Sequence, residues 1–253
     1  MNFPQKLFAI LALLPGLAFA ASGGHPLDKA PPRASMTSLQ NGAKLFVNHC
    51  LNCHSASSMR YNRLKDLGLD DKQIIDNLLF TQDKVGGLMT TALRPADAKE
   101  WFGVIPPDLS VIARAKASPK GTGPDYLYTY LRTFYRDETT PTGWNNLVMP
   151  NVAMPHVMWQ MQGVRTVKMV EQADPHDATK KVHVFGGFEQ VTPGTMSSAQ
   201  FDEATADLVG YMEWMAEPAA ASRKKLGVWV LFLMSFFVLF TWLLSKSYWK
   251  EVK

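Results

Sequence analysis

The sequence HCLNCHS, residues 49–55, holds both cysteines of this 253-residue chain, three positions apart, with a histidine directly after the second. In a helical turn, positions i and i+3 share one face. Cys50 and Cys53 can therefore both reach the edge of one flat ring and form thioethers with its vinyl groups. His54 can then swing over the face of that ring and bind iron. This spacing predicts the covalent attachment of one c-type haem.

Three other uses of a Cys-x-x-Cys pair agree less well with the surrounding residues. A thioredoxin-like pair normally follows a strand, whereas residues 39–50, LQNGAKLFVNHC, have the apolar spacing of a helix. A zinc site needs two more ligands, and the chain has no second cysteine pair. A disulfide between positions i and i+3 is geometrically awkward. Haem attachment is therefore the interpretation that these residues favour.

An apolar segment lies near each end of the chain. Residues 7–20 follow Lys6 and end in Ala-Phe-Ala, the pattern of a secretory signal peptide that is cleaved after Ala20. An uncleaved anchor is the alternative there. Residues 226–244 contain no charge, and as a helix they span roughly 28 Å, close to the hydrocarbon thickness of a bilayer. They predict one transmembrane helix, with a buried helix as the alternative.

The two end segments predict the organisation of the whole chain. We expect a signal peptide at 1–20, a periplasmic haem domain at 21–222, a transmembrane anchor at 223–245 and a cytoplasmic tail at 246–253. Basic residues flank the anchor on both sides, so they give no orientation, and the signal peptide places the haem domain outside. Between Ala21 and Ser222 the chain has 19 basic and 21 acidic residues, which does not indicate a nucleic-acid-binding surface.

The residues alone leave alternatives for the second axial ligand of the iron, because a histidine-bound haem takes Met or His, or stays open. The Asn- and Pro-rich stretch NNLVMPNVAMPHVMWQMQG, residues 145–163, predicts a loop with four methionines and one histidine. Such a loop can close over the haem face opposite His54, and a neutral thioether ligand raises the reduction potential. Met154 and His156 are the two candidates.

Several stretches together resemble cytochrome c1, the haem subunit of the quinol:cytochrome c oxidoreductase (cytochrome bc1) complex. The haem motif alone is typical of any c-type cytochrome. PPDLS and the W-x-A-E-P pattern just before the apolar segment are more specific. The matching stretches are VNHCLNCHSASSMRYNRL (47–64), PPDLSVIARAK (106–116), NVAMPHVMW (151–159), MEWMAEP (212–218) and the single C-terminal apolar segment.

The resemblance implies a role for individual residues of the haem site. Cys50 and Cys53 match the thioether positions, His54 matches the proximal ligand and Met154 matches the distal ligand. That match leaves His156 as a neighbour of the ligand. Some members of the family carry an extra disulfide, for which this chain has no cysteine left.

The resemblance also implies four further residues close to the haem. Pro107 matches a residue that packs on the ring, and Tyr126 matches a tyrosine nearby, with ordinary core packing as the alternative. The family commonly has R-A-R after PPDLS, near a haem propionate, where this chain has Arg114-Ala115-Lys116. Because lysine lacks the bidentate fork of arginine, Arg114 is the safer propionate contact of the two.

The predicted fold is mainly α, a class I cytochrome c-like haem domain with long loop insertions, plus one C-terminal transmembrane helix. The first and last helices of the domain are expected to cross, with Gly42 allowing a close approach. A hairpin is expected at 165–171 and 180–188, and residues 21–36 look irregular. The expected helices span 37–56, 70–80, 95–101, 108–117, 124–136 and 199–216, the last with an apolar stripe of Phe201, Leu208, Tyr211, Met212 and Met215.

The resemblance implies a respiratory electron-transfer subunit with one haem c in the bacterial inner membrane, single-pass, with the haem domain in the periplasm. The expected partners are a cytochrome b subunit, a Rieske iron–sulfur protein, a soluble or tethered cytochrome c and membrane lipid, without nucleic acid. One alternative is a membrane-tethered cytochrome c that acts as a shuttle or as an oxidase subunit. Another, haem sensing or peroxidase activity, needs an open sixth position on the iron.

Overall fold

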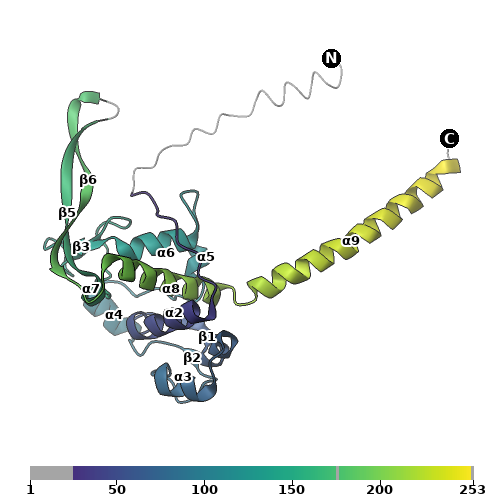
Figure 1. The fold of residues 1–253 in the computed structure, drawn as a ribbon, viewed down its shortest axis with the longest axis horizontal. Coiled ribbons are helices and arrows are strands. Elements are labelled where there is room, and N and C mark those ends of the chain that lie inside the picture. The colour runs from purple at the N-terminus through teal and green to yellow at the C-terminus, as the bar shows by residue number, and fades with distance from the viewer. Residues whose placement is uncertain (1–24, 175–176, 252–253) are drawn as a thin grey trace.

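The computed structural model describes residues 25–174 and 177–251 (Figure 1). The predicted signal peptide, residues 1–20, lies outside the described residues. The helices are α2 Met36–His49, α3 Asp71–Asn77, α4 Pro95–Phe102, α5 Ile112–Ala115, α6 Gly123–Arg132, α7 Trp159–Gln162, α8 Ser198–Ala216 and α9 Ala220–Tyr248, with short 3₁₀ helices at Tyr61–Leu67 and Trp249–Glu251. The strands are β1 Ala56–Arg60, β2 Leu88–Met89, β3 Phe134–Arg136, β4 Trp144–Asn146, β5 Gly163–Asp174 and β6 Asp177–Pro193.

The centre of the domain is the crossing of α2 and α8 (Figure 1). Gly42 of α2 makes the crossing tight, because a Cβ there would lie 2.1 Å from the backbone oxygen of Asp207. One turn further along α2, the ring of Phe46 packs on Tyr211 with centroids 5.4 Å apart. The predicted stripe on α8 is buried throughout, so the expected crossing of the first and last domain helices is confirmed.

Short-range hydrogen bonds determine where α2, α6 and α8 begin. Ser35 caps α2 by accepting from the backbone of Ser38. Thr122 and Ser197 begin α6 and α8 with capping boxes. In each box, the side chain of the capping residue accepts from the backbone amide three positions later, and the side chain at that position accepts from the backbone amide of the capping residue. Gly123 lets α6 start directly against α5, since a Cβ there would clash with the carbonyl of Ala113.

Four predicted helices end earlier or are shorter than expected, among them the helix expected over 70–80, which is α3 and ends at Asn77. The helix expected over 37–56 ends at His49, and the haem motif continues as a turn in which the amides of Cys53 and His54 both donate to the Cys50 carbonyl. Residues 108–117 form only the short helix α5. The helix expected over 124–136 ends at Arg132, because residues 134–136 pair with 144–146 as an antiparallel ladder.

Two elements project from the domain in different directions (Figure 1). The hairpin of β5 and β6 is longer than predicted, because the antiparallel register continues through irregularities after Val164 and Lys168. The helix α9 leaves the domain after α8, and the most apolar stretch of its segment Ser222–Tyr248 has a mean hydropathy of 2.3 and no buried residue. The mainly α class with one apolar C-terminal helix is therefore confirmed.

We predict that Gly42→Ala lowers stability. The added methyl forces α2 away from Asp207, and overpacking of this kind costs about 1–3 kcal/mol. This exceeds the gain of about 0.5–1 kcal/mol that alanine brings to a helix interior. Thermal unfolding of the full-length chain in detergent measures the difference. Gly86→Ala is the control, because nothing lies within 4 Å of the position of its Cβ. Equal melting temperatures for both variants would contradict the tight crossing.

We predict an acid-sensitive contact between the N-terminal segment and α6. Asp125 accepts from Lys29 Nζ at 2.8 Å, from the Ala30 amide at 3.0 Å and from the Thr122 amide at 3.0 Å. Burial opposes ionisation of Asp125, yet these hydrogen bonds lower its pKa from 3.8 to about 2. Because the pKa is lower in the folded state, the carboxylate stabilises the protein above pH 3.8. That stability is lost as the pH falls towards 2.

Asp125→Asn should therefore reduce the free energy of unfolding at neutral pH by about 1.5–3 kcal/mol, the range for hydrogen bonds to a charged group. The difference from wild type should shrink as the pH falls below 3.8. Urea unfolding at several pH values measures both effects. Asp66→Asn, which removes an exposed pair with Arg63, is the control and should change little. A difference that stays constant down to low pH would contradict the prediction.

Candidate haem-binding site

The two cysteines lie in the turn that follows α2. Cys50 is the last capping residue of the helix and is buried in the core, whereas Cys53 is half-buried, and the two thiols are not bridged. Burial raises the pKa of Cys50 to about 12, with a smaller contribution from Cys53, and burial also raises the pKa of Cys53. Both side chains are therefore protonated thiols at neutral pH. Two unbridged thiols on one turn fit attachment to two vinyl groups of one ring.

The imidazole of His54 is oriented by the PPDLS segment. Its Nδ1 lies 2.8 Å from the carbonyl oxygen of Pro107, which can only accept, so Nδ1 carries the proton. Nε2 is then the atom with a free lone pair, the state that metal-binding histidines adopt. Burial lowers the pKa of His54, which keeps the imidazole neutral. Pro107 is predicted to pack on the haem ring, and in the structure its carbonyl makes this contact with His54.

Further hydrogen bonds connect the PPDLS segment to the haem motif. The Leu109 amide donates to the Ser55 carbonyl at 2.8 Å, and the Ser57 amide donates to Asp108 Oδ2 at 2.8 Å. Although desolvation opposes ionisation of Asp108, hydrogen bonds from Ser110 and Ser57 hold its pKa below the usual value. The two segments, far apart in the sequence, therefore form one rigid side of the site.

Met154 lies on a separate part of the domain, formed by α6 and the loop that was predicted around it. Its half-buried side chain packs against the cluster of Phe134, Trp144 and Val152. Its Sδ lies 3.4 Å from the hydroxyl oxygen of Tyr130, which donates to it. Tyr130 is not among the residues predicted from the sequence, although its position four residues after Tyr126 on a predicted helix places both on one face.

His156, the other candidate ligand from the residues alone, is a packed core side chain. It is 2% exposed and stacks on Phe134 with centroids 4.9 Å apart. Its Nε2 is 2.8 Å from Gln162 Oε1, so the ring nitrogen is already paired. Burial, partly offset by that hydrogen bond, lowers the pKa of His156 to about 3. The ring is therefore neutral and occupied by structural contacts.

Lys116, Tyr126 and Arg114 lie close to this region on α5 and α6. Lys116 Nζ lies 4.9 Å from the centroid of the Tyr126 ring, and Tyr126 stacks on Tyr130 with centroids 5.9 Å apart. Arg114 points elsewhere, since its Nη1 donates to Glu217 Oε1 at 2.8 Å, and Glu217 also binds Arg223 at the start of α9. Of the two basic residues, Lys116 is the one beside the tyrosine pair.

The two parts of the site are linked through the PPDLS segment, α5 and the tyrosines of α6. His54 contacts Pro107, and the PPDLS segment leads directly into α5. From α5, Lys116 contacts Tyr126 on α6, whose neighbour Tyr130 reaches Met154. Two thiols, an imidazole with an unprotonated Nε2 and a thioether are the donor set of a haem c with histidine and methionine ligands. The residues present therefore fit the group.

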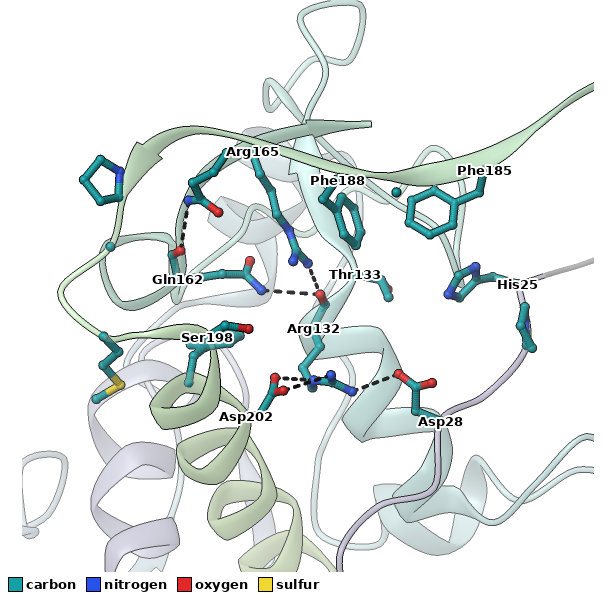
Figure 2. A pocket seen from close by; sticks show the side chains of 17 residues that line it. His25, Asp28, Arg132, Thr133, Gln162, Arg165, Phe185, Phe188, Ser198 and Asp202 are labelled. Carbon is teal, nitrogen blue, oxygen red and sulfur yellow. Dashed lines mark hydrogen bonds and ion pairs between the residues drawn. The ribbon is translucent and has the colours of Figure 1, made fainter. Parts of the chain in front are cut away.

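Figure 2 shows a cavity of about 730 Å³ that is lined by other residues. It is bordered by the base of the hairpin, the N-terminal segment, α6 and α8, and no predicted site residue lines it. Arg132 pairs there with Asp28 and Asp202, and Arg165 donates to the backbone oxygen of Arg132 (Figure 2). Arg165 also donates to the backbone oxygen of Phe134. The contacts of Arg165 attach the base of the hairpin to the domain. The charged residues around this cavity therefore have a structural role.

Comparison with known proteins finds relatives that match the chain over most of its length. The model of the Cytochrome C1 family matches residues 33–184 and 188–252. The chain is 45% identical to the ammonia monooxygenase gamma subunit of Nitrosomonas europaea, over the full length of both proteins. It is 39% identical to cytochrome c1 of Allochromatium vinosum, over 97% of this chain and 98% of that protein. It is 31% identical to the mitochondrial cytochrome c1 haem protein of Saccharomyces cerevisiae, over 85% of this chain and 67% of that protein.

The family model covers the haem motif, the PPDLS segment, the loop with Met154 and the apolar helix in a single order. These are the segments from which the donor set is built. The family model matches most of the chain, and a relative named cytochrome c1 is similar to it over nearly the full length of both proteins. The chain belongs to the cytochrome c1 family.

Proposed function

We propose that this chain accepts single electrons from a Rieske iron–sulfur protein and passes them to a cytochrome c on the periplasmic side of a bacterial inner membrane. Family membership makes it the electron-transfer haem subunit of a cytochrome bc1 complex, associated with cytochrome b and the Rieske protein. That complex is a quinol:cytochrome c oxidoreductase, and this chain contributes electron transfer to it. The covalent haem c, when bound, supplies the one-electron redox chemistry.

We assign the four protein bonds to the haem as the sequence analysis predicted them. Cys50 and Cys53 would hold the haem through thioethers, and His54 and Met154 would bind its iron. The observation that supports this most directly is the 2.8 Å contact of His54 Nδ1 with a backbone carbonyl, next to two unbridged thiols. It leaves Nε2 unprotonated and holds the ring in one orientation, as a histidine ligand requires.

Basic side chains near the haem edge are proposed to pair with its propionates. Lys116, beside Tyr126, is free of an ion-pair contact in the part of the chain that the structure describes, and it can reach towards a carboxylate. Arg114 is engaged with Glu217, which makes it a less direct candidate. Pro107 and Tyr126 are proposed to line the ring, the first through its position beside His54 and the second as part of the aromatic stack.

The apolar helix α9 is proposed to be the membrane anchor. The segment Ser222–Tyr248 spans roughly 40 Å as a helix and buries none of its most apolar stretch against the domain. Apolar surface of this extent requires lipid or an apolar partner such as cytochrome b. The proposed organisation is a signal peptide at 1–20, a periplasmic domain at 21–222, the anchor at 223–245 and a cytoplasmic tail at 246–253.

A membrane-tethered cytochrome c that serves an oxidase, or that acts as a shuttle, is the alternative function. It uses the same haem chemistry and the same anchor, so the site geometry is equally compatible with both. What separates them is the partner. The name of the Nitrosomonas europaea relative points to a third assembly, an ammonia monooxygenase, for that protein.

We predict that Met154→Leu loses the long-wavelength charge-transfer band of a methionine–iron bond and lowers the reduction potential. The physical reason is loss of a neutral thioether that favours ferrous iron. Absorption spectroscopy and a redox titration of the purified full-length protein measure both effects. Met149→Leu is the matched control, since Met149 lies in the same loop and is exposed. A band that survives Met154→Leu but is lost in another methionine variant would show that the ligand is wrongly assigned.

We predict that the native protein, solubilised in mild detergent, elutes with a cytochrome b subunit and an iron–sulfur protein. Mass spectrometry of the complex and the spectrum of its b-type haems identify these subunits. Deletion of residues 226–253 should release the haem-containing domain from them, because the anchor provides the contact with cytochrome b. Elution with a copper-containing oxidase, or with an ammonia monooxygenase, would contradict the proposed function.

A further inference from the structure

The hydroxyl of Tyr130 lies 3.4 Å from Met154 Sδ, within the range of a hydrogen bond to sulfur. A thioether has no proton to give, so the phenol is the donor. We infer that Tyr130 is a positioning residue that holds the Met154 thioether and raises the reduction potential of the haem. This inference rests on the proposed function, because it takes Met154 as the axial ligand.

The Tyr130 ring is held in place on several sides. It stacks on Tyr126 with an angle of 10° between the rings, and its centroid lies 5.1 Å from that of Phe134 in an edge-to-face contact. Its backbone carbonyl accepts from Asn146 Nδ2 at 2.8 Å. Within the described residues, Met154 Sδ is the one hydrogen-bond partner of the Tyr130 hydroxyl. The donor is therefore aimed at the sulfur by packing and does not alternate between partners.

The effect on the potential follows from the two lone pairs of a thioether sulfur. When one lone pair binds iron, the other remains available to accept from Tyr130. Donation to the sulfur withdraws electron density from it and weakens its bond to ferric iron more than its bond to ferrous iron, because the higher charge depends more on donated electrons. The hydrogen bond therefore favours the reduced state, as contacts around a metal ligand commonly tune the metal.

The same contact also restricts Met154. Methionine has three rotatable side-chain bonds and adapts easily to its surroundings, so packing alone specifies its sulfur position weakly. The Phe134, Trp144 and Val152 cluster confines the side chain, and the Tyr130 hydroxyl selects where the sulfur lies within that space. A purely structural role for Tyr130 would need the ring and not the hydroxyl, and this difference can be tested.

The test compares Tyr130→Phe with wild type in the full-length, haem-containing protein. The variant keeps the ring and removes only the donor. We expect the charge-transfer band of the methionine–iron bond to remain, and the equilibrium constant for reduction by a reference couple to fall about two- to tenfold, the range that one neutral hydrogen bond spans. Tyr128→Phe is the control, since Tyr128 is on the same helix but packs on Arg132. The reduction potential of the haem in this control variant should equal that of wild type.

The outcomes separate this inference from the ligand assignment. If Met154→Leu keeps the band, the assignment of Met154 fails and the inference fails with it. If Met154→Leu loses the band while Tyr130→Phe has the wild-type potential, the inference is overturned and the proposed function stands. Should Tyr130→Phe not retain haem, the ferrous wild-type protein gives a second measurement. A nuclear Overhauser effect between the Tyr130 hydroxyl proton and the Met154 methyl group supports the contact, and its absence overturns the inference.

Discussion

The close approach of α2 and α8 is the constraint on which the other parts of this protein depend. It is possible because Gly42 has no side chain where the carbonyl of Asp207 lies. The crossing buries the end of α2, and with it Cys50, so the haem motif begins in the core. The helix α8 continues from this crossing to Ala216, and α9 leaves the domain directly after it (Figure 1). The crossing therefore lies between the haem motif at the end of α2 and the apolar helix that follows α8.

Hydrogen bonds to the backbone, more than direct side-chain pairs, organise the site around that core. Pro107 orients His54 through its carbonyl, and Asp108 accepts from the Ser57 amide. Glu217 connects this region to the anchor, because it binds Arg114 of α5 and Arg223 of α9. A hydrogen bond from Arg223, together with the nearby positive charges, lowers the pKa of Glu217. The orientation of the haem domain relative to the membrane helix is therefore supported by a charged contact at their junction.

Most helices could be predicted from apolar spacing, but several of their ends could not. The apolar stripe on α8 is a local pattern, and all of its predicted residues are buried. The end of α2 at His49 depends on the turn in which Cys53 and His54 donate to Cys50, and the end of α6 depends on a strand pairing with residues 144–146. Sequence spacing reports which face of a segment is apolar. It does not report where the backbone finds its next hydrogen-bond partner, which is a matter of tertiary contact.

The sequence by itself determined the chemistry of the protein: two cysteines and a histidine at haem spacing, a loop rich in methionine and one helix of membrane length. These are local patterns, and each is complete within about 30 residues or fewer. Only the tertiary structure decided that His156 is paired within the core, that Arg114 binds Glu217 and that Tyr130 donates to Met154. Each of these depends on which segments meet in space, and sequence order does not specify such contacts because they join residues on different elements.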